Sequence, residues 1–131
     1  MISTLGNISM KTDYAEMVRR SLEPEHSVLI AVDIQEKLLP PIFEKDRLVK
    51  NSQLLIRLAG LLDIPVIVST QYAKGLGGTV PQIASLVPTT SAIDKTMFSC
   101  FGSDVFCATM KRLPGNRTTV LLCGMESHIC V

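Results

Sequence analysis

Three residues that lie far apart in the sequence have side chains suited to nucleophilic chemistry: Asp33, Lys95 and Cys130. A cysteine thiolate is a strong nucleophile, but near neutral pH it needs a cation or a dipole beside it. Lys95 can supply the positive charge, and Asp33 can accept the thiol proton and later pass it to a leaving amine. Backbone N–H groups of the turn 125–130 can hold the oxyanion of a tetrahedral intermediate. These groups together favour acyl transfer to water through a thioester.

Each of the three residues ends or follows a stretch whose composition predicts a strand. Continuous apolar runs rich in β-branched residues are typical of strands that a parallel sheet buries on both faces. The expected strands cover residues 27–33, 64–70, 91–94 and 117–123, the third being the weakest. Asp33 ends the first of them, Lys95 follows the third and Cys130 comes after the fourth.

Helical segments separate these strands. Leucines recur at helical spacing between Asp46 and Leu62, which predicts an amphipathic helix, and a second helix is expected over residues 103–113. Residues 74–78 are glycine-rich and predict a loop that leads into a short helix at 82–86.

The alternation of strands and helices predicts an α/β fold, doubly wound around a mostly parallel sheet in a Rossmann-like three-layer α/β/α arrangement. Right-handed crossovers bring the carboxyl ends of such strands to one edge, where ligand sites lie. We therefore expect Asp33, Lys95 and Cys130 to meet there.

Composition narrows the class of protein further. The chain has 131 residues and a net charge of +1 without a basic cluster, so neither nucleic acid nor a membrane is expected as a partner. A polar N-terminal arm, 1–26, lacks an apolar signal core and precedes one domain, 27–131. We expect a cytoplasmic protein. The four cysteines form no C-x-x-C pair and only two histidines are present, so no metal or other cofactor is expected.

Four segments, taken in order, resemble the isochorismatase-like cysteine hydrolases, a superfamily that includes nicotinamidases and carbamoylsarcosine amidases. They are Val32-Asp33-Ile34-Gln35, Thr70-Gln71-Tyr72 with Lys74-Gly75-Leu76-Gly77, Lys95-Thr96-Met97-Phe98-Ser99, and Gly124-Met125-Glu126-Ser127-His128-Ile129-Cys130. The resemblance runs from about Val28 to Val131. It implies the doubly wound fold and a catalytic triad of Asp33, Lys95 and Cys130.

The resemblance also implies further features of the site. A cis peptide at Met125–Glu126 would place the amides of Glu126 and Cys130 as the oxyanion hole. Gln35, Tyr72 and Phe98 are expected to bind the substrate, although simple packing is an alternative for the two aromatic residues.

Two departures from the superfamily pattern refine the expectation. Nicotinamidase-type members bind a divalent metal through an aspartate and several histidines, whereas no histidine lies between His26 and His128 here. The Gln-Tyr-x-Lys-Gly-Leu-Gly form at 71–77 instead looks like the metal-free branch. Superfamily domains also continue past the cysteine, so this chain is expected to lack the last strand–helix units and to need a partner chain.

The function that we predict is hydrolysis of a small amide or related C–N bond, with a small-molecule substrate and a homo-oligomeric assembly. The alternative from another class is a non-catalytic fragment or pseudoenzyme that acts through oligomerisation. A third possibility is a thiol redox protein that uses Cys130 with Cys100 or Cys123.

Overall fold

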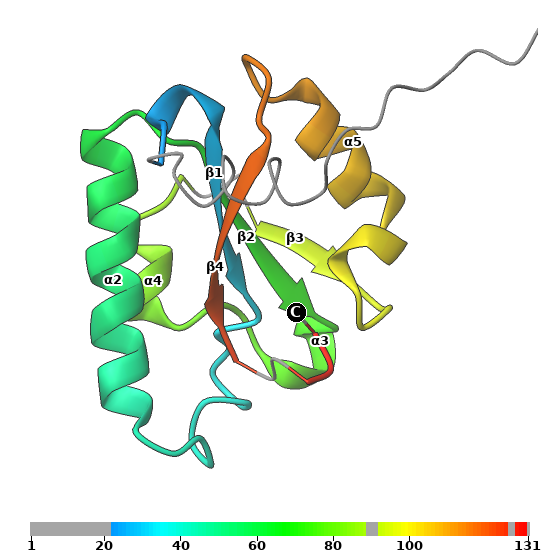
Figure 1. Ribbon diagram of the computed structural model, residues 1–131. Coiled ribbons are helices and arrows are strands. Elements are labelled where there is room, and N and C mark those ends of the chain that lie inside the picture. The colour runs from blue at the N-terminus through cyan, green and yellow to red at the C-terminus, as the bar shows by residue number, and fades with distance from the viewer. Residues whose placement is uncertain (1–21, 89–91, 126–127, 131) are drawn as a thin grey trace, which may run out of the picture.

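A four-stranded parallel sheet forms the centre of the molecule (Figure 1). The computed structural model describes residues 22–88, 92–125 and 128–130. The strands lie in the order β3-β2-β1-β4, and every neighbouring pair is parallel. Their bounds are β1 Ser27–Val32, β2 Val66–Gln71, β3 Ala92–Lys95 and β4 Thr119–Gly124. The predicted parallel α/β architecture is confirmed.

Helices cover both faces of this sheet, as Figure 1 shows. The long helix α2 (Lys45–Leu61) and the short α4 (Pro81–Ala84) pack on one face, and α5 (Asp104–Arg112) lies on the other. Short 3-10 turns, η1 (Pro24–His26) and η2 (Cys100–Gly102), precede β1 and α5. The doubly wound, three-layer arrangement follows from these crossovers.

The central strand β1 explains why the sheet needs an apolar run rather than an alternating one. All six of its residues are buried. Leu29 and Ala31 face the cluster beneath α2, whereas Ile30 and Val32 face the cluster that holds Phe106 of α5. Because successive side chains point to opposite faces and both faces are covered, every position of β1 has to be apolar or internally paired.

The strand register brings the predicted site residues to one edge. Val32, the last residue of β1, pairs with Ser69 of β2 and with Gly124 of β4. Gln71, at the end of β2, pairs with Lys95. The residues that follow these positions therefore leave the sheet on the same side.

Several sequence-based boundaries differ from the structure, among them the end of the first strand, which is Val32 and not Asp33. Lys95 is the last residue of β3 and does not follow it. Residues 74–78 were expected to form a loop, but Ala73–Leu76 form the short helix α3, in which the amide of Leu76 donates to the carbonyl of Tyr72. The start of β2 lies at Val66 and not at residue 64, after Pro65, which lacks an N–H for the ladder. Glycine-rich composition predicts turns well, yet a single helical turn can satisfy the same backbone groups.

The described end of the predicted N-terminal arm, residues 22–26, lies against the body of the domain. Nη1 of Arg117 donates to the carbonyl of Pro24 at 2.8 Å, and the amide of Thr118 donates to the carbonyl of His26 at 2.9 Å. These bonds connect η1 to the segment that leads into β4.

Gly124 ends β4 in a conformation that requires glycine. Its φ is +150°, and a Cβ built on it would lie 2.3 Å from the carbonyl oxygen of Val32. Gly124→Ala is therefore expected to lower the free energy of unfolding by about 3 kcal/mol, measured by urea denaturation.

The matched control for this change is Gly60→Ala. Gly60 lies inside α2 with open space around its Cβ position. There the same substitution should raise the free energy of unfolding by about 0.5–1 kcal/mol, because alanine favours the helix. Equal unfolding midpoints for the two variants would contradict the close approach of Gly124 to β1.

Candidate functional site

Asp33 and Lys95 form a buried ion pair at the carboxyl ends of β1 and β3. Nζ of Lys95 lies 2.8 Å from Oδ2 of Asp33, and the two side chains are 1% and 0% exposed. Taking both charges out of water costs several kcal/mol, so such a pair is weak evidence for stability alone. Paired titratable groups of this kind cluster at functional sites, which makes this pair the centre of the candidate site.

Two residues of β2 complete the polar contacts of the pair. Oγ of Ser69 donates to Oδ1 of Asp33 at 2.8 Å, and Nζ of Lys95 donates to Oε1 of Gln71 at 2.8 Å. Both oxygens of the carboxylate thus have a donor, and the ammonium has two acceptors. The sequence reasoning did not include Ser69 in the site. The signal was present: polar residues at positions 69 and 71 of a buried strand point to the same face.

The backbone at two strand ends takes the left-handed conformation. Asp33, directly after β1, has φ +52°, and Tyr72, directly after β2, has φ +41°. For residues other than glycine this costs of order 1–2 kcal/mol, and such strain is found where surrounding contacts compensate for it. The compensation here includes two hydrogen bonds, from the amide of Asp33 to the carbonyl of Ser69 and from that of Tyr72 to the carbonyl of Lys95.

Cys130 lies in a turn on the α5 face of the sheet and is 6% exposed. It belongs to the apolar cluster of Val32 and Phe106, and it lines a cavity of about 200 Å³ together with Val32 and Cys100. Since Val32 directly precedes Asp33, the cysteine lies near the sheet edge that carries the ion pair. Glu126 and the Met125–Glu126 peptide, predicted for the oxyanion hole, lie outside the described residues.

The three residues predicted to bind substrate have different surroundings. Gln35 is fully buried, and its side-chain nitrogen donates to the carbonyls of Gln71 and Gly77 at 3.0 and 2.7 Å. Its oxygen accepts the amide of Gln71 at 2.7 Å. Tyr72 and Phe98 are 50% and 63% exposed, so neither is part of the core. Gln35 thus connects β1 to β2 and to the end of α3, and a role of all three in substrate binding stays a prediction.

The other cysteines differ in their surroundings. Burial raises the pKa of the Cys123 thiol above its usual 9.0, although a hydrogen bond with Ser52 partly offsets this. Because the pKa is raised in the folded state, this contribution to stability is fully present below the pKa of the unfolded chain. It is lost as the pH rises from there through the raised pKa of the folded protein. Cys107 is half-buried, and its Sγ donates to the carbonyl of Phe101 at 3.4 Å.

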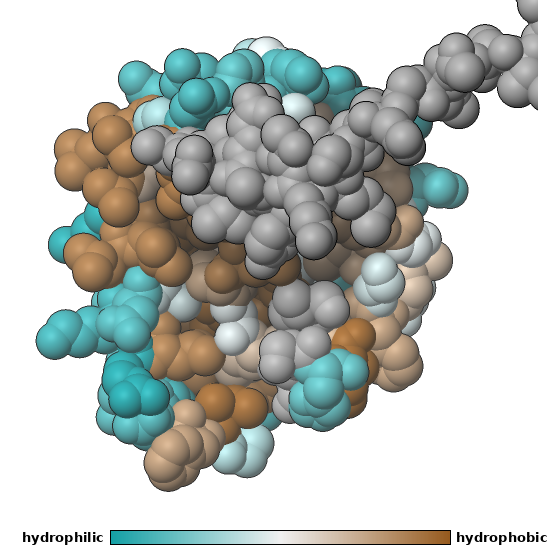
Figure 2. All heavy atoms as spheres, viewed as in Figure 1, coloured by the Kyte–Doolittle hydropathy of each residue, from teal (hydrophilic) through white to brown (hydrophobic). Residues whose placement is uncertain are grey.

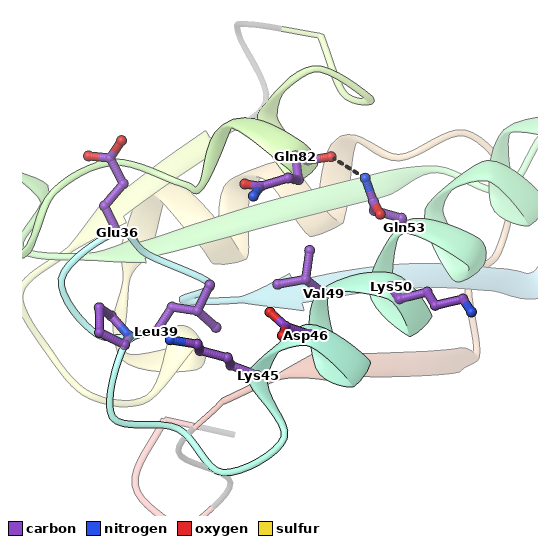
Figure 3. Close-up of a pocket in the computed structure, with 9 residues that line it drawn as sticks. Glu36, Leu39, Lys45, Asp46, Val49, Lys50, Gln53 and Gln82 are labelled. Atoms are coloured by element: carbon purple, nitrogen blue, oxygen red, sulfur yellow. Dashed lines mark hydrogen bonds between the residues drawn. The ribbon is translucent and has the colours of Figure 1, made fainter.

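A second cavity, of about 300 Å³, lies beside the N-terminal half of α2 (Figure 3). Its wall carries charged side chains of both signs, and the side-chain nitrogen of Gln53 donates to the carbonyl of Gln82 at 3.1 Å. The residues that line it are Glu36, Leu39, Pro40, Lys45, Asp46, Val49, Lys50, Gln53 and Gln82. Because the Asp33–Lys95 pair and Cys130 do not contribute to its wall, this cavity is separate from the candidate site.

In the part of the chain that the structure describes, no group of three His, Cys, Asp or Glu side chains lies close enough together to hold a metal ion. Within the same residues no helix combines the length and the apolar character that a bilayer crossing requires.

The class of protein follows from this arrangement: a doubly wound α/β domain with a buried Asp–Lys pair at the carboxyl edge of its parallel sheet. The family model of the isochorismatase domain matches residues 27–131. The chain belongs to the isochorismatase family.

Individual relatives agree with this assignment. Isochorismatase domain-containing protein 2 of Danio rerio is 38% identical over 112 residues, which cover 84% of this chain and 54% of that protein. The secreted isochorismatase effector Isc1 of Phytophthora sojae is 35% identical over 113 residues, 84% of this chain and 53% of that protein. The solved MAR1 ribonuclease of Caenorhabditis elegans is 36% identical with a TM-score of 0.74, covering 85% of this chain and 56% of that one. The chain thus spans about half the length of the curated relatives that it matches.

Proposed function

We propose that this chain carries the nucleophile and the acid–base pair of a cysteine hydrolase that cleaves a small amide or a related C–N bond. The observation that supports this most directly is the buried contact of 2.8 Å between Lys95 Nζ and Asp33 Oδ2. It lies at the sheet edge where α/β proteins bind their ligands, and Cys130 lines a cavity next to it.

In the first half of the proposed reaction, Asp33 accepts the proton of the Cys130 thiol. The thiolate then attacks the carbonyl carbon of the amide, and the C–N bond of the tetrahedral intermediate breaks. The leaving nitrogen takes the proton from Asp33 and departs as an amine, which leaves a thioester on Cys130. The ammonium of Lys95 stabilises the negative charge that moves between sulfur and carboxylate.

In the second half, water replaces the amine. Asp33 takes a proton from the water molecule while the water oxygen attacks the thioester carbon. The sulfur of Cys130 then leaves and receives that proton from Asp33. The products are a carboxylic acid, an amine and the free thiol. In this proposal the amides of Glu126 and Cys130 hold the oxyanion in both halves, as the family resemblance implies.

A trapping screen tests the proposal. The protein is incubated with a panel of small primary and secondary amides, quenched in acid and analysed by peptide mass spectrometry. An acyl group on Cys130 that disappears on longer incubation is the expected result, because the thioester is hydrolysed. The absence of acylation and of turnover across the panel would contradict the proposal. A structured RNA belongs in the panel as well, since the Caenorhabditis elegans relative is described as a ribonuclease.

Partners and compartment form part of the same proposal. We propose a small-molecule substrate and a homo-oligomer, and we keep the cytoplasm as the proposed location. The Phytophthora sojae relative is described as secreted, so fractionation of the native source is the relevant check.

A second candidate function is assembly without catalysis, and exposed leucines favour it. Leu54 and Leu61, one heptad apart on α2, are 66% and 82% exposed. Figure 2 shows apolar side chains gathered over this part of α2. On the other face of the sheet, Val120 and Leu122 of the edge strand β4 are 40% and 51% exposed. Among the described residues β4 pairs only with β1, and apolar patches and edge strands of this kind mark association surfaces.

Light scattering coupled to size-exclusion chromatography tests the assembly function, and the trapping screen tests whether the oligomer is also a catalyst. Under the assembly function the wild-type protein is an oligomer, and Leu54→Glu with Leu61→Glu shifts it to a monomer without loss of folded signal in circular dichroism. A wild-type monomer at micromolar concentration would count against assembly.

A further inference from the structure

The Asp33–Lys95 pair is the middle of a longer chain of buried hydrogen bonds. Sγ of Cys100 donates to Oγ of Ser69 at 3.7 Å, and Oγ of Ser69 donates to Oδ1 of Asp33 at 2.8 Å. Nζ of Lys95 donates to Oδ2 of Asp33 and also to Oε1 of Gln71. The chain connects η2, β2, β1 and β3.

The direction of each bond in this chain is determined by the donors available. Ser69 has one hydroxyl proton, and Asp33 as a carboxylate can only accept, so that proton points to Asp33. The lone pairs of the Ser69 oxygen then remain for the thiol proton of Cys100. Ser69 and Asp33 are 0% exposed and Cys100 is 7% exposed. Within a site of such burial, a hydrogen bond is electrostatically stronger than in water.

The two donors restrict how the Asp33 carboxylate can turn. The terminal torsion of an aspartate is broad, so a carboxylate with a single partner samples a wide range of planes. Here Ser69 engages one oxygen and Lys95 engages the other, both at 2.8 Å. The carboxylate is therefore held in one plane at the sheet edge.

We propose that Ser69 is a positioning residue for the acid–base step, and that the thiol of Cys100 orients its hydroxyl. The inference rests on the proposed function of Asp33 as the group that exchanges a proton with Cys130. Proton transfer needs donor and acceptor within hydrogen-bond reach, and a misplacement of about 1 Å can cost up to about 100-fold in rate. Ser69 contributes by keeping Asp33 in the orientation that this transfer needs.

Kinetics of two Ser69 variants test the proposal. Ser69→Ala removes the donor and is expected to lower kcat about 10- to 100-fold with KM nearly unchanged, because substrate contacts stay intact. Ser69→Thr keeps the hydroxyl and should restore kcat to within about threefold of the wild type.

Ser52→Ala provides the matched control. Ser52 is a serine of similar burial, 2% exposed, on α2, where its side chain forms a hydrogen bond with Cys123. Loss of its hydroxyl should lower the free energy of unfolding by an amount similar to that for Ser69→Ala and leave kcat unchanged. Equal kcat values for Ser69→Ala and Ser52→Ala would overturn the proposal.

A second readout keeps the inference separate from the proposed function. Nitrogen NMR of the Lys95 ammonium reports on the ion pair without substrate: a buried ammonium with two acceptors exchanges its protons slowly. Ser69→Ala should speed this exchange, whereas Ser52→Ala should not. If Cys130→Ala still hydrolyses amides, the proposed function is wrong. The exchange rate of the Lys95 ammonium in Ser69→Ala then tests by itself whether Ser69 holds the ion pair in place. If that exchange rate and kcat are both unchanged in Ser69→Ala, the positioning role is wrong while the hydrolase proposal stands.

Discussion

Replacing Cys130 with alanine is expected to abolish amide hydrolysis, lowering kcat by about 10⁴-fold or more. Under the proposed mechanism the sulfur of Cys130 forms the covalent intermediate, and alanine cannot form one. The acyl adduct in the trapping screen should disappear together with turnover. The measurement is the steady-state rate on the best amide from that screen, with peptide mass spectrometry in parallel.

Two further variants control the Cys130 experiment. Cys107→Ala removes a half-buried thiol on α5 and should leave turnover within about twofold of the wild type, because surface changes away from a site have small effects. Cys130→Ser keeps the shape and one proton but gives a far weaker nucleophile, so it should be almost as inactive as alanine. Normal hydrolysis by Cys130→Ala would refute the assignment of the nucleophile.

The second large effect concerns stability. Lys95→Met is expected to lower the free energy of unfolding by about 3–5 kcal/mol, because it leaves the Asp33 carboxylate buried without a counter-charge. The oxygen of Gln71 loses a donor at the same time. Urea denaturation of the wild type and the variant, with a common slope, gives the difference directly.

A double variant distinguishes the charge from the packing. Adding Asp33→Asn to Lys95→Met removes the second charge. The double variant should therefore lose less free energy of unfolding than the sum of the losses in the two single variants. The exposed pair of Arg47 and Glu44 is the matched reference, with side chains 68% and 39% exposed. Arg47→Met should cost no more than about 1 kcal/mol, since solvent screens such pairs. Similar losses for Lys95→Met and Arg47→Met would contradict the buried ion pair.

The fold could be predicted from the sequence because its strongest signals are local. The run from Val28 to Val32 is apolar at every position, and the leucines of residues 46–62 repeat at helical spacing. Each pattern permits few alternatives, and their alternation implies parallel strands with helical crossovers. The α3 turn was missed because four residues are too few for periodicity to be visible.

The candidate site could be predicted only in part. Asp33 stood out because a carboxylate ends an otherwise apolar run, and Lys95 because it follows the third expected strand. The structure brings the two into contact. Ser69 and Gln71 were not recognised as their partners. A serine or a glutamine near a strand end is common, and its partner depends on the register of β1, β2 and β3.

The amino-acid sequence by itself determined the family, the order of strands and helices, and the residue types that can act at the edge of the sheet. Only the tertiary structure decided which groups touch: that Ser69 holds one oxygen of Asp33 and Lys95 the other, and that Gln35 bonds to backbone of neighbouring segments. The physical reason is range. Apolar periodicity can be recognised within a few consecutive residues. The partners of the buried Lys95 side chain, in contrast, lie 24 and 62 positions away in the sequence, on other strands or at their ends.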